Sequence, residues 1–143
     1  NTWNGDAWTG CNTITSILLV IRSIMTKEPL SHEPGIDESH RDFYKYQEIV
    51  RYKNIKLAML DVFNKPYYKN DFGDLFDIAK SDFMENLESK KEIIDKSVKA
   101  WNESNVGTNA NQVVYMSIYS MATQIDYQQL SVMLLETAKQ LTQ

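Results

Sequence analysis

The stretch TITSILLVIRSIMT, residues 13–26, decides how this chain folds. Thr13 is a residue type favoured at helix N-caps, and apolar side chains then recur at the three- and four-residue steps of an amphipathic helix. We therefore predict a helix over residues 13–26 whose apolar face needs a packing partner. The stripe on that face consists of Ile14, Ile17, Leu18, Ile21 and Met25.

Leu19 lies outside this stripe. At about 100° per residue it points about 140° away from Ile14, next to Thr15, Ser16 and Ser23. An apolar side chain among small hydroxyls is a plausible docking point for an apolar patch on another protein. Single exposed leucines are also ordinary on protein surfaces, so the residues alone leave both interpretations open.

The rest of the chain predicts further helices. A second should begin at Glu38 or Ser39 and end at Asn64, because Pro66 cannot continue it. A third helical region should cover residues 71–103, with a break near residues 88–91. Residues 105–111 read as a loop, and residues 113–121 suit either a strand or a helix. Asp126 is typical of an N-cap and predicts a last helix over residues 127–142.

Each predicted helix has an inward-facing stripe. In the second we expect Ile49, Tyr52, the stem of Lys56, Met59, Leu60 and Phe63 to face inward. In the third we expect Leu75, Phe76, Ala79, Phe83, Leu87, Ile94, Val98 and Trp101. In the last we expect Tyr127, Leu130, Leu134, Ala138 and Leu141. The fold class that follows is mostly α.

Composition narrows the function classes. The 143 residues are 43% hydrophobic and 24% charged, which is typical of one globular domain. The net charge of −4 argues against a nucleic-acid partner, which usually needs a basic excess. The longest apolar run, residues 17–21, is far shorter than the roughly 20 residues of a membrane helix. A single cysteine excludes an internal disulfide, so we expect a cytoplasmic or nuclear protein without a membrane partner.

Few residues suggest chemistry. His32 and His40 lack the spacing of a zinc site, and no glycine-rich phosphate loop occurs, so we expect no metal and no cofactor. Cys11 precedes a helix start, where a thiol pKa can fall, but an unpaired cysteine is more often a small buried side chain. Carboxylates recur at three- to four-residue steps between residues 71 and 92. They are typical of a solvated helix face paired with nearby lysines.

The beginning of the chain resembles the ubiquitin-conjugating (E2) enzymes. The resemblance rests on Trp8-Thr9-Gly10-Cys11, on the helix that follows, and on the succession of short motifs after it. Those later motifs are Met25-Thr26-Lys27-Glu28-Pro29, Glu33-Pro34-Gly35, Tyr46, Val50-Arg51 and Ile55-Lys56 with Ala58-Met59. The order of motifs is similar to that of the larger E2 enzymes over about residues 3–63, with a weaker echo over residues 125–135.

The resemblance implies an enzyme that accepts ubiquitin or a ubiquitin-like modifier from an E1 as a cysteine thioester. The modifier is then transferred to a lysine, usually with an E3 ligase. Cys11 stands where the family has an alanine, so the nucleophile is expected upstream of Asn1. The chain would then be the C-terminal helical half of the α+β E2 (UBC) fold, without its N-terminal helix and four-stranded sheet, and inactive by itself. Residues 1–63 would belong to the E2-like domain and residues 64–143 to a helical extension.

The resemblance also assigns roles to residues. Ser16, Leu19 and Ser23 match the helix face on which donor ubiquitin rests before transfer, which agrees with the position of Leu19 outside the stripe. Thr9, Gly10 and Cys11 match the loop that contacts the E3 ligase, although Gly10 replaces the usual proline. Trp8 matches a structural tryptophan beneath the active-site loop.

Two rival interpretations remain. The chain could be a non-catalytic, E2-derived helical module that binds ubiquitin or another protein. It could also be an unrelated helical interaction or structural protein, in which the E2-like run is a coincidence. A cysteine upstream would favour the enzyme over the module, and strands packed beneath residues 14–25 in the complete protein would argue against the unrelated protein.

Overall fold

A computed structural model describes residues 13–104 and 112–143. The chain divides into two units, Asn1–Glu48 and Ile49–Gln143, which are described separately. The described residues are mostly helical, with one small two-stranded sheet, so the predicted fold class is confirmed at that level.

The first unit contains helix α1, Ile14–Ile24, as the sequence predicted. Thr13 caps it, because its hydroxyl accepts a hydrogen bond from the backbone N–H of Ser16 at 3.1 Å. No side chain of α1 is buried. A short 3₁₀ helix, η1, follows at Pro29–His32, and helix α2 covers Phe43–Lys53.

Helix α2 starts later than predicted. The carboxylate of Asp37 accepts hydrogen bonds from the backbone N–H of Ser39 at 2.8 Å and from its hydroxyl at 2.5 Å. This turn occupies the residues where the sequence predicted the helix to begin. The pKa of Asp37 is lowered, first by the hydrogen bond from the Ser39 hydroxyl and then by the one from its N–H.

In the second unit α2 passes into a π-helical segment, η2, Asn54–Asp61, and then α3, Val62–Asn64. The wider turn of a π-helix explains why Ile55 and Leu60, five residues apart, are both buried. The sequence prediction assumed 3.6 residues per turn, so it put the stem of Lys56 on the inward face and left out Ile55. The helical run ends at Asn64, as predicted, and Pro66 begins the next helix, where its missing N–H costs nothing.

Helix α4, Pro66–Glu85, and helix α5, Leu87–Ser104, meet at Asn86 rather than at residues 88–91. The expected inward position of Leu75 is wrong, because Leu75 is exposed. Phe76 and Phe83 are seven residues, about two turns, apart and define the buried line of this helix. Leu75 lies one residue off that line.

A β-hairpin resolves the ambiguous stretch after residue 112. Strand β1, Gln112–Met116, pairs with antiparallel strand β2, Met121–Ile125, with Val114 opposite Thr123. Ser120, in the connecting turn, has a positive φ of 49°. Helix α6, Tyr127–Thr142, follows as predicted, and the Asp126 carboxylate accepts the N–H of Gln129 at 2.9 Å.

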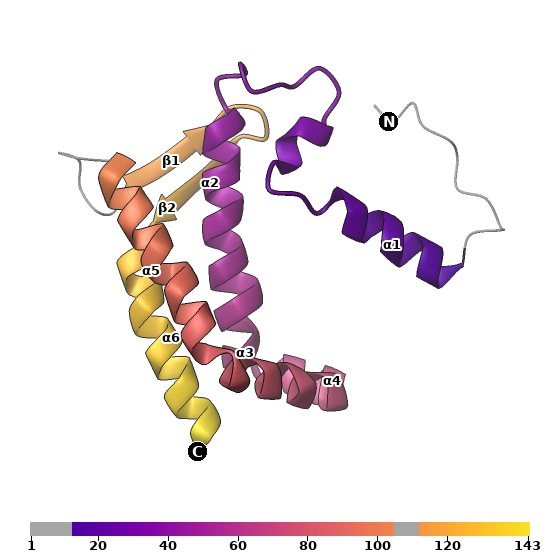
Figure 1. Ribbon diagram of the computed structural model, residues 1–143, viewed down its shortest axis with the longest axis vertical. Helices are drawn as coiled ribbons and strands as arrows, with labels where there is room; N and C mark the ends of the chain where they lie inside the picture. Colours follow the sequence, from indigo (N-terminus) through magenta and orange to yellow (C-terminus); the bar gives the residue numbers. More distant parts are fainter. Residues whose placement is uncertain (1–12, 105–111) are drawn as a thin grey trace. The chain divides into compact units, whose positions relative to one another are not determined.

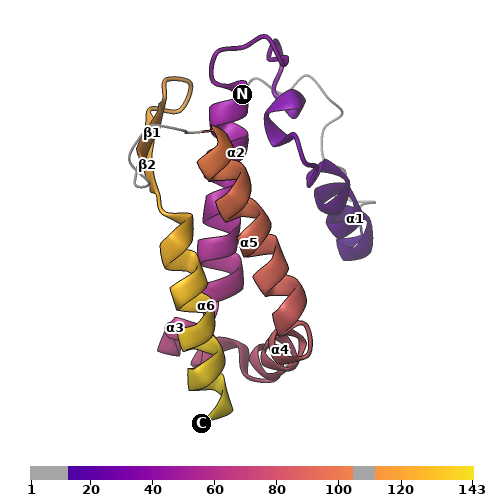
Figure 2. The same cartoon turned by 60° about the vertical axis from the view of Figure 1, so that its left-hand side comes forward.

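Helices α5 and α6 lie side by side and run in opposite directions, while α4 lies crosswise at their lower end (Figures 1 and 2). Aromatic rings join the helices: Tyr52 meets Tyr127 edge to face with centroids 5.4 Å apart, and Phe63 lies 4.9 Å from Phe83. The second unit therefore has its own hydrophobic core. Its members are Tyr52, Ile55, Leu60, Phe63, Phe76, Phe83, Ile94, Trp101, Ile125, Tyr127, Leu130, Leu134, Ala138 and Leu141.

Candidate functional site

The candidate site built entirely from described residues is the face of α1 that carries Ser16, Leu19 and Ser23. These residues follow one another at steps of three and four, so they share one side of the helix. Leu19 is 59% exposed. The side chain is thus available to a partner.

The two hydroxyls on this face are held by the helix itself. The Ser16 hydroxyl donates to the backbone carbonyl of Thr13 at 2.8 Å, and the Ser23 hydroxyl donates to that of Val20 at 2.7 Å. With each proton used in this way, each oxygen still has lone pairs that can accept a hydrogen bond. The face therefore offers an apolar side chain between two acceptors, which suits a partner that presents N–H donors around an apolar group.

The opposite side of α1 is the apolar stripe predicted from the sequence. Leu18 is 59% exposed and Ile21 is 42% exposed, while Ile17 is half-buried. Large apolar side chains in contact with water destabilise a chain relative to their burial. One helix therefore presents two different surfaces, an apolar stripe and a face with a leucine between hydroxyls.

The other residues assigned by resemblance lie outside the described residues. These are Trp8 and the E3-contact loop Thr9, Gly10 and Cys11. Their roles stay predictions. The roles of Ser16, Leu19 and Ser23 in docking a modifier stay predictions too, since exposure shows only that they are accessible.

Both histidines have local hydrogen-bond partners. The Thr26 hydroxyl lies 3.1 Å from Nε2 of His32, and Nδ1 of His40 accepts the backbone N–H of Asp42 at 3.1 Å. Among residues 13–104 and 112–143, no group of three His, Cys, Asp or Glu side chains is placed to hold a metal ion. In the same residues no helix is long and apolar enough to cross a membrane.

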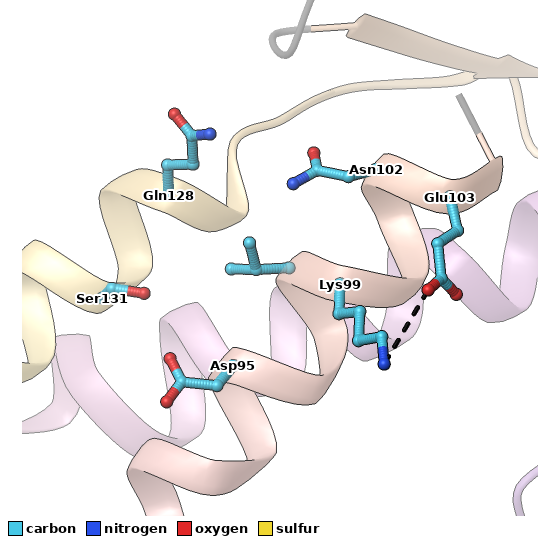
Figure 3. Close-up of a pocket in the computed structure, with 7 residues that line it drawn as sticks. Asp95, Lys99, Asn102, Glu103, Gln128 and Ser131 are labelled. Atoms are coloured by element: carbon cyan, nitrogen blue, oxygen red, sulfur yellow. Dashed lines mark ion pairs between the residues drawn. The ribbon is translucent and has the colours of Figure 1, made fainter. Parts of the chain in front are cut away.

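An open depression of about 520 Å³ lies between α5 and α6 (Figure 3). The ammonium of Lys99 lies 3.9 Å from a carboxylate oxygen of Glu103 on one side. The lining contains neither a histidine nor a cysteine. Sequence periodicity missed this depression because its residues come from two helices. They are Asp95, Val98, Lys99, Asn102, Glu103, Gln128 and Ser131.

Two shifted pKa values in the second unit belong to structural contacts. Burial raises the pKa of Tyr52, whose hydroxyl hydrogen-bonds the backbone of Asp126. At the α4–α5 corner the hydrogen bond from Lys90, 2.9 Å from the carboxylate of Asp82, lowers the pKa of that carboxyl. Lys90 also lies 5.7 Å from the ring centroid of Phe83. These contacts hold elements of the second unit together.

Comparison with known proteins relates part of the chain to the ubiquitin-conjugating (E2) enzymes. A 63-residue stretch is 36% identical to "Ubiquitin-conjugating enzyme E2 Z" of Homo sapiens and equally to that of Rattus norvegicus, and 35% identical to that of Danio rerio. It covers 43% of this chain and 18–19% of those proteins. The chain therefore spans about a fifth of the length of the curated relatives it matches. No family model matches the chain.

Proposed function

We propose that this chain is the C-terminal, helical part of an E2-type enzyme that transfers ubiquitin or a ubiquitin-like modifier. The observation that carries the proposal is the 36% identity to E2 Z over 63 residues. In this proposal a cysteine upstream of Asn1 takes the modifier from an E1 as a thioester. The thioester then passes the modifier to a lysine, with an E3 ligase holding both.

The two surfaces of α1 support this assignment. In the proposal the stripe of Ile14, Leu18 and Ile21 packs on a sheet encoded upstream, which accounts for its exposure here. The face with Leu19 remains open and receives donor ubiquitin. Burial of a leucine contributes roughly 1.5–3 kcal/mol, enough to favour the orientation in which the thioester reacts.

The proposal divides the chain at residues 63 and 64, into the E2-like domain and a helical extension. Residues 64–143 contain α4, α5, the hairpin and α6, and they pack on the helical run that ends at Asn64. An extension of this kind would position a partner or support the E2-like domain.

The complete protein tests the class of enzyme. It should form a reducible adduct with ubiquitin, or with a ubiquitin-like modifier, when incubated with E1, ATP and the modifier. Substitution of the upstream cysteine by serine should abolish that adduct. A complete sequence without a cysteine upstream of Asn1 would overturn the proposal that the protein is an E2-type enzyme.

The second candidate is a non-catalytic, E2-derived module that binds ubiquitin or another protein. It is favoured by the fact that the Leu19 face lies wholly within this chain and needs no nucleophile to bind a partner. A module should bind free ubiquitin, with chemical-shift changes at Leu19, and form no thioester. Thioester formation decides between the two candidates.

A further inference from the structure

The first half of α4 carries apolar side chains that the core does not use. Tyr67, Phe72, Leu75 and Ile78 are all exposed, the last two by 65% each. Leu75 and Ile78 follow Gly73 and lie three residues apart, on one side of the helix. Phe76 lies on the buried side instead, and its ring centroid is 5.7 Å from that of Phe63. Tyr67 and Phe72 belong to the helical segment before this glycine, so the exposed apolar side chains that share one side of a regular helix are Leu75 and Ile78.

Carboxylates accompany these apolar side chains. Asp71, Asp74 and Asp77 are exposed and form no ion pair with any residue in 13–104 or 112–143. We call the combined set the α4 surface; it consists of Tyr67, Asp71, Phe72, Asp74, Leu75, Asp77 and Ile78.

Several carboxylates that follow along the chain are different, because each lies within 4 Å of a lysine nitrogen. The distances between lysine nitrogen and carboxylate oxygen are 2.9 Å for Lys90–Asp82, 3.7 Å for Lys91–Glu88 and 3.3 Å for Lys96–Glu92. Lys99 likewise lies 3.9 Å from Glu103. The prediction that the carboxylates between residues 71 and 92 pair with nearby lysines is thus confirmed for Asp82, Glu88 and Glu92. Glu85 instead accepts a hydrogen bond from the Ser81 hydroxyl at 2.9 Å. Within residues 13–104 and 112–143, the three aspartates of the α4 surface thus have no lysine or arginine at ion-pair distance.

We propose that the α4 surface binds a segment of a partner protein in which Lys or Arg flank apolar side chains, such as a basic amphipathic helix. Burial of Leu75 and Ile78 would supply the attraction, and cations on the partner would pair with the three aspartates. Nucleic acid and anionic lipid would be repelled by the same charges. A second copy of this chain would set carboxylates against carboxylates, and the chain as a whole carries a net charge of −4.

The test uses the full chain and a fluorescein-labelled helical peptide of Leu and Lys with one apolar face, measured by fluorescence anisotropy. A peptide with Glu in place of Lys serves as its counterpart. The Lys peptide should bind and the Glu peptide should not. The triple variant Asp71→Asn, Asp74→Asn, Asp77→Asn should bind the Lys peptide about tenfold more weakly, and added salt should weaken the wild type more than this variant.

Two matched controls distinguish binding at the α4 surface from effects of net charge and of nonspecific hydrophobic contact. The variant Glu88→Gln, Glu92→Gln, Glu103→Gln removes three carboxylates from α5 and should leave binding within twofold. Leu75→Ser with Ile78→Ser should weaken binding at least tenfold, whereas Val132→Ser with Leu135→Ser, at similarly exposed positions of α6, should not. Circular dichroism should show the same helix content in every variant, since all changed side chains are exposed.

Several outcomes would overturn the proposal. If the Glu peptide bound as strongly as the Lys peptide, the three aspartates would not select a basic partner. Equal losses in the two triple variants would show a net-charge effect rather than a site. No binding of the Lys peptide would show that the partner chemistry is wrong. A dimer of the wild type that Leu75→Ser with Ile78→Ser dissociates would identify a second copy as the occupant.

Discussion

Leucine substitutions offer a direct measure of what covers the stripe on α1. Leu18 on α1 is 59% exposed and Leu134 on α6 is 1% exposed. Truncating a buried leucine to alanine removes transfer free energy and leaves a cavity, at a cost of about 2–5 kcal/mol. The same change at Leu18 removes side-chain atoms that are mostly in water already, and alanine is the better helix former, so the free energy of unfolding should change by less than about 0.5 kcal/mol.

Urea denaturation followed by circular dichroism would measure both variants in this 143-residue chain. Leu134→Ala should lower the free energy of unfolding by at least 2 kcal/mol, and Leu18→Ala should leave it unchanged within error. In the complete protein, where we propose that a sheet covers the stripe, Leu18→Ala should approach the cost of Leu134→Ala. Equal losses from the two substitutions in the short chain would contradict the exposure of Leu18 that the structure describes.

Three further predictions concern contacts in the second unit. Lys90 lowers the pKa of Asp82 from 3.8, so the stability from this contact is present above about pH 4 and is lost as pH falls through the lowered value. Asp82→Asn should therefore make the free energy of unfolding less dependent on pH on the acid side. A pH dependence equal to that of the wild type would contradict this prediction. Burial raises the pKa of Tyr52 above 10.0, so the stability that the neutral side chain contributes is present below about pH 10 and is lost as pH rises through the raised value. Tyr52→Phe should therefore make the free energy of unfolding less sensitive to alkali. A decline at alkaline pH equal to that of the wild type would argue against this prediction. Asp126→Ala removes the N-cap of α6 and should cost about 1 kcal/mol in urea denaturation, whereas a neutral result would show that water replaces the cap.

Helix boundaries set by local chemistry were predictable from the sequence. Thr13 and Asp126 cap α1 and α6 because their side-chain oxygens accept nearby backbone N–H groups, which depends only on adjacent residues. The end of α3 at Asn64 follows in the same way from Pro66. The break within the third predicted helical region was placed at residues 88–91, where charge interrupts the apolar pattern, and the true corner lies at Asn86.

Features that depend on backbone irregularity or on distant partners were not predictable. The π-helical turn moved Ile55 to the buried side, which a fixed helical period cannot anticipate. Leu75 and Phe76 are adjacent and point about 100° apart, and only contacts with distant residues decide that Phe76 is the buried one. The strand at 112–116 needed its partner at 121–125 to be distinguished from a helix. In the candidate site, the position of Leu19 outside the apolar stripe was predictable from the helical period, but its exposure does not distinguish it from Leu18, since both are 59% exposed.

The most direct test of the account is single-turnover discharge of the modifier thioester to lysine by the complete protein. Leu19→Asp should slow discharge about tenfold, because a carboxylate cannot be buried against an apolar patch, while charging by E1 stays unchanged. Leu135→Asp, at a 61% exposed position on α6, is the matched control and should have no effect. Discharge by Leu19→Asp at the wild-type rate would contradict the assignment of the α1 face as the docking site for the modifier.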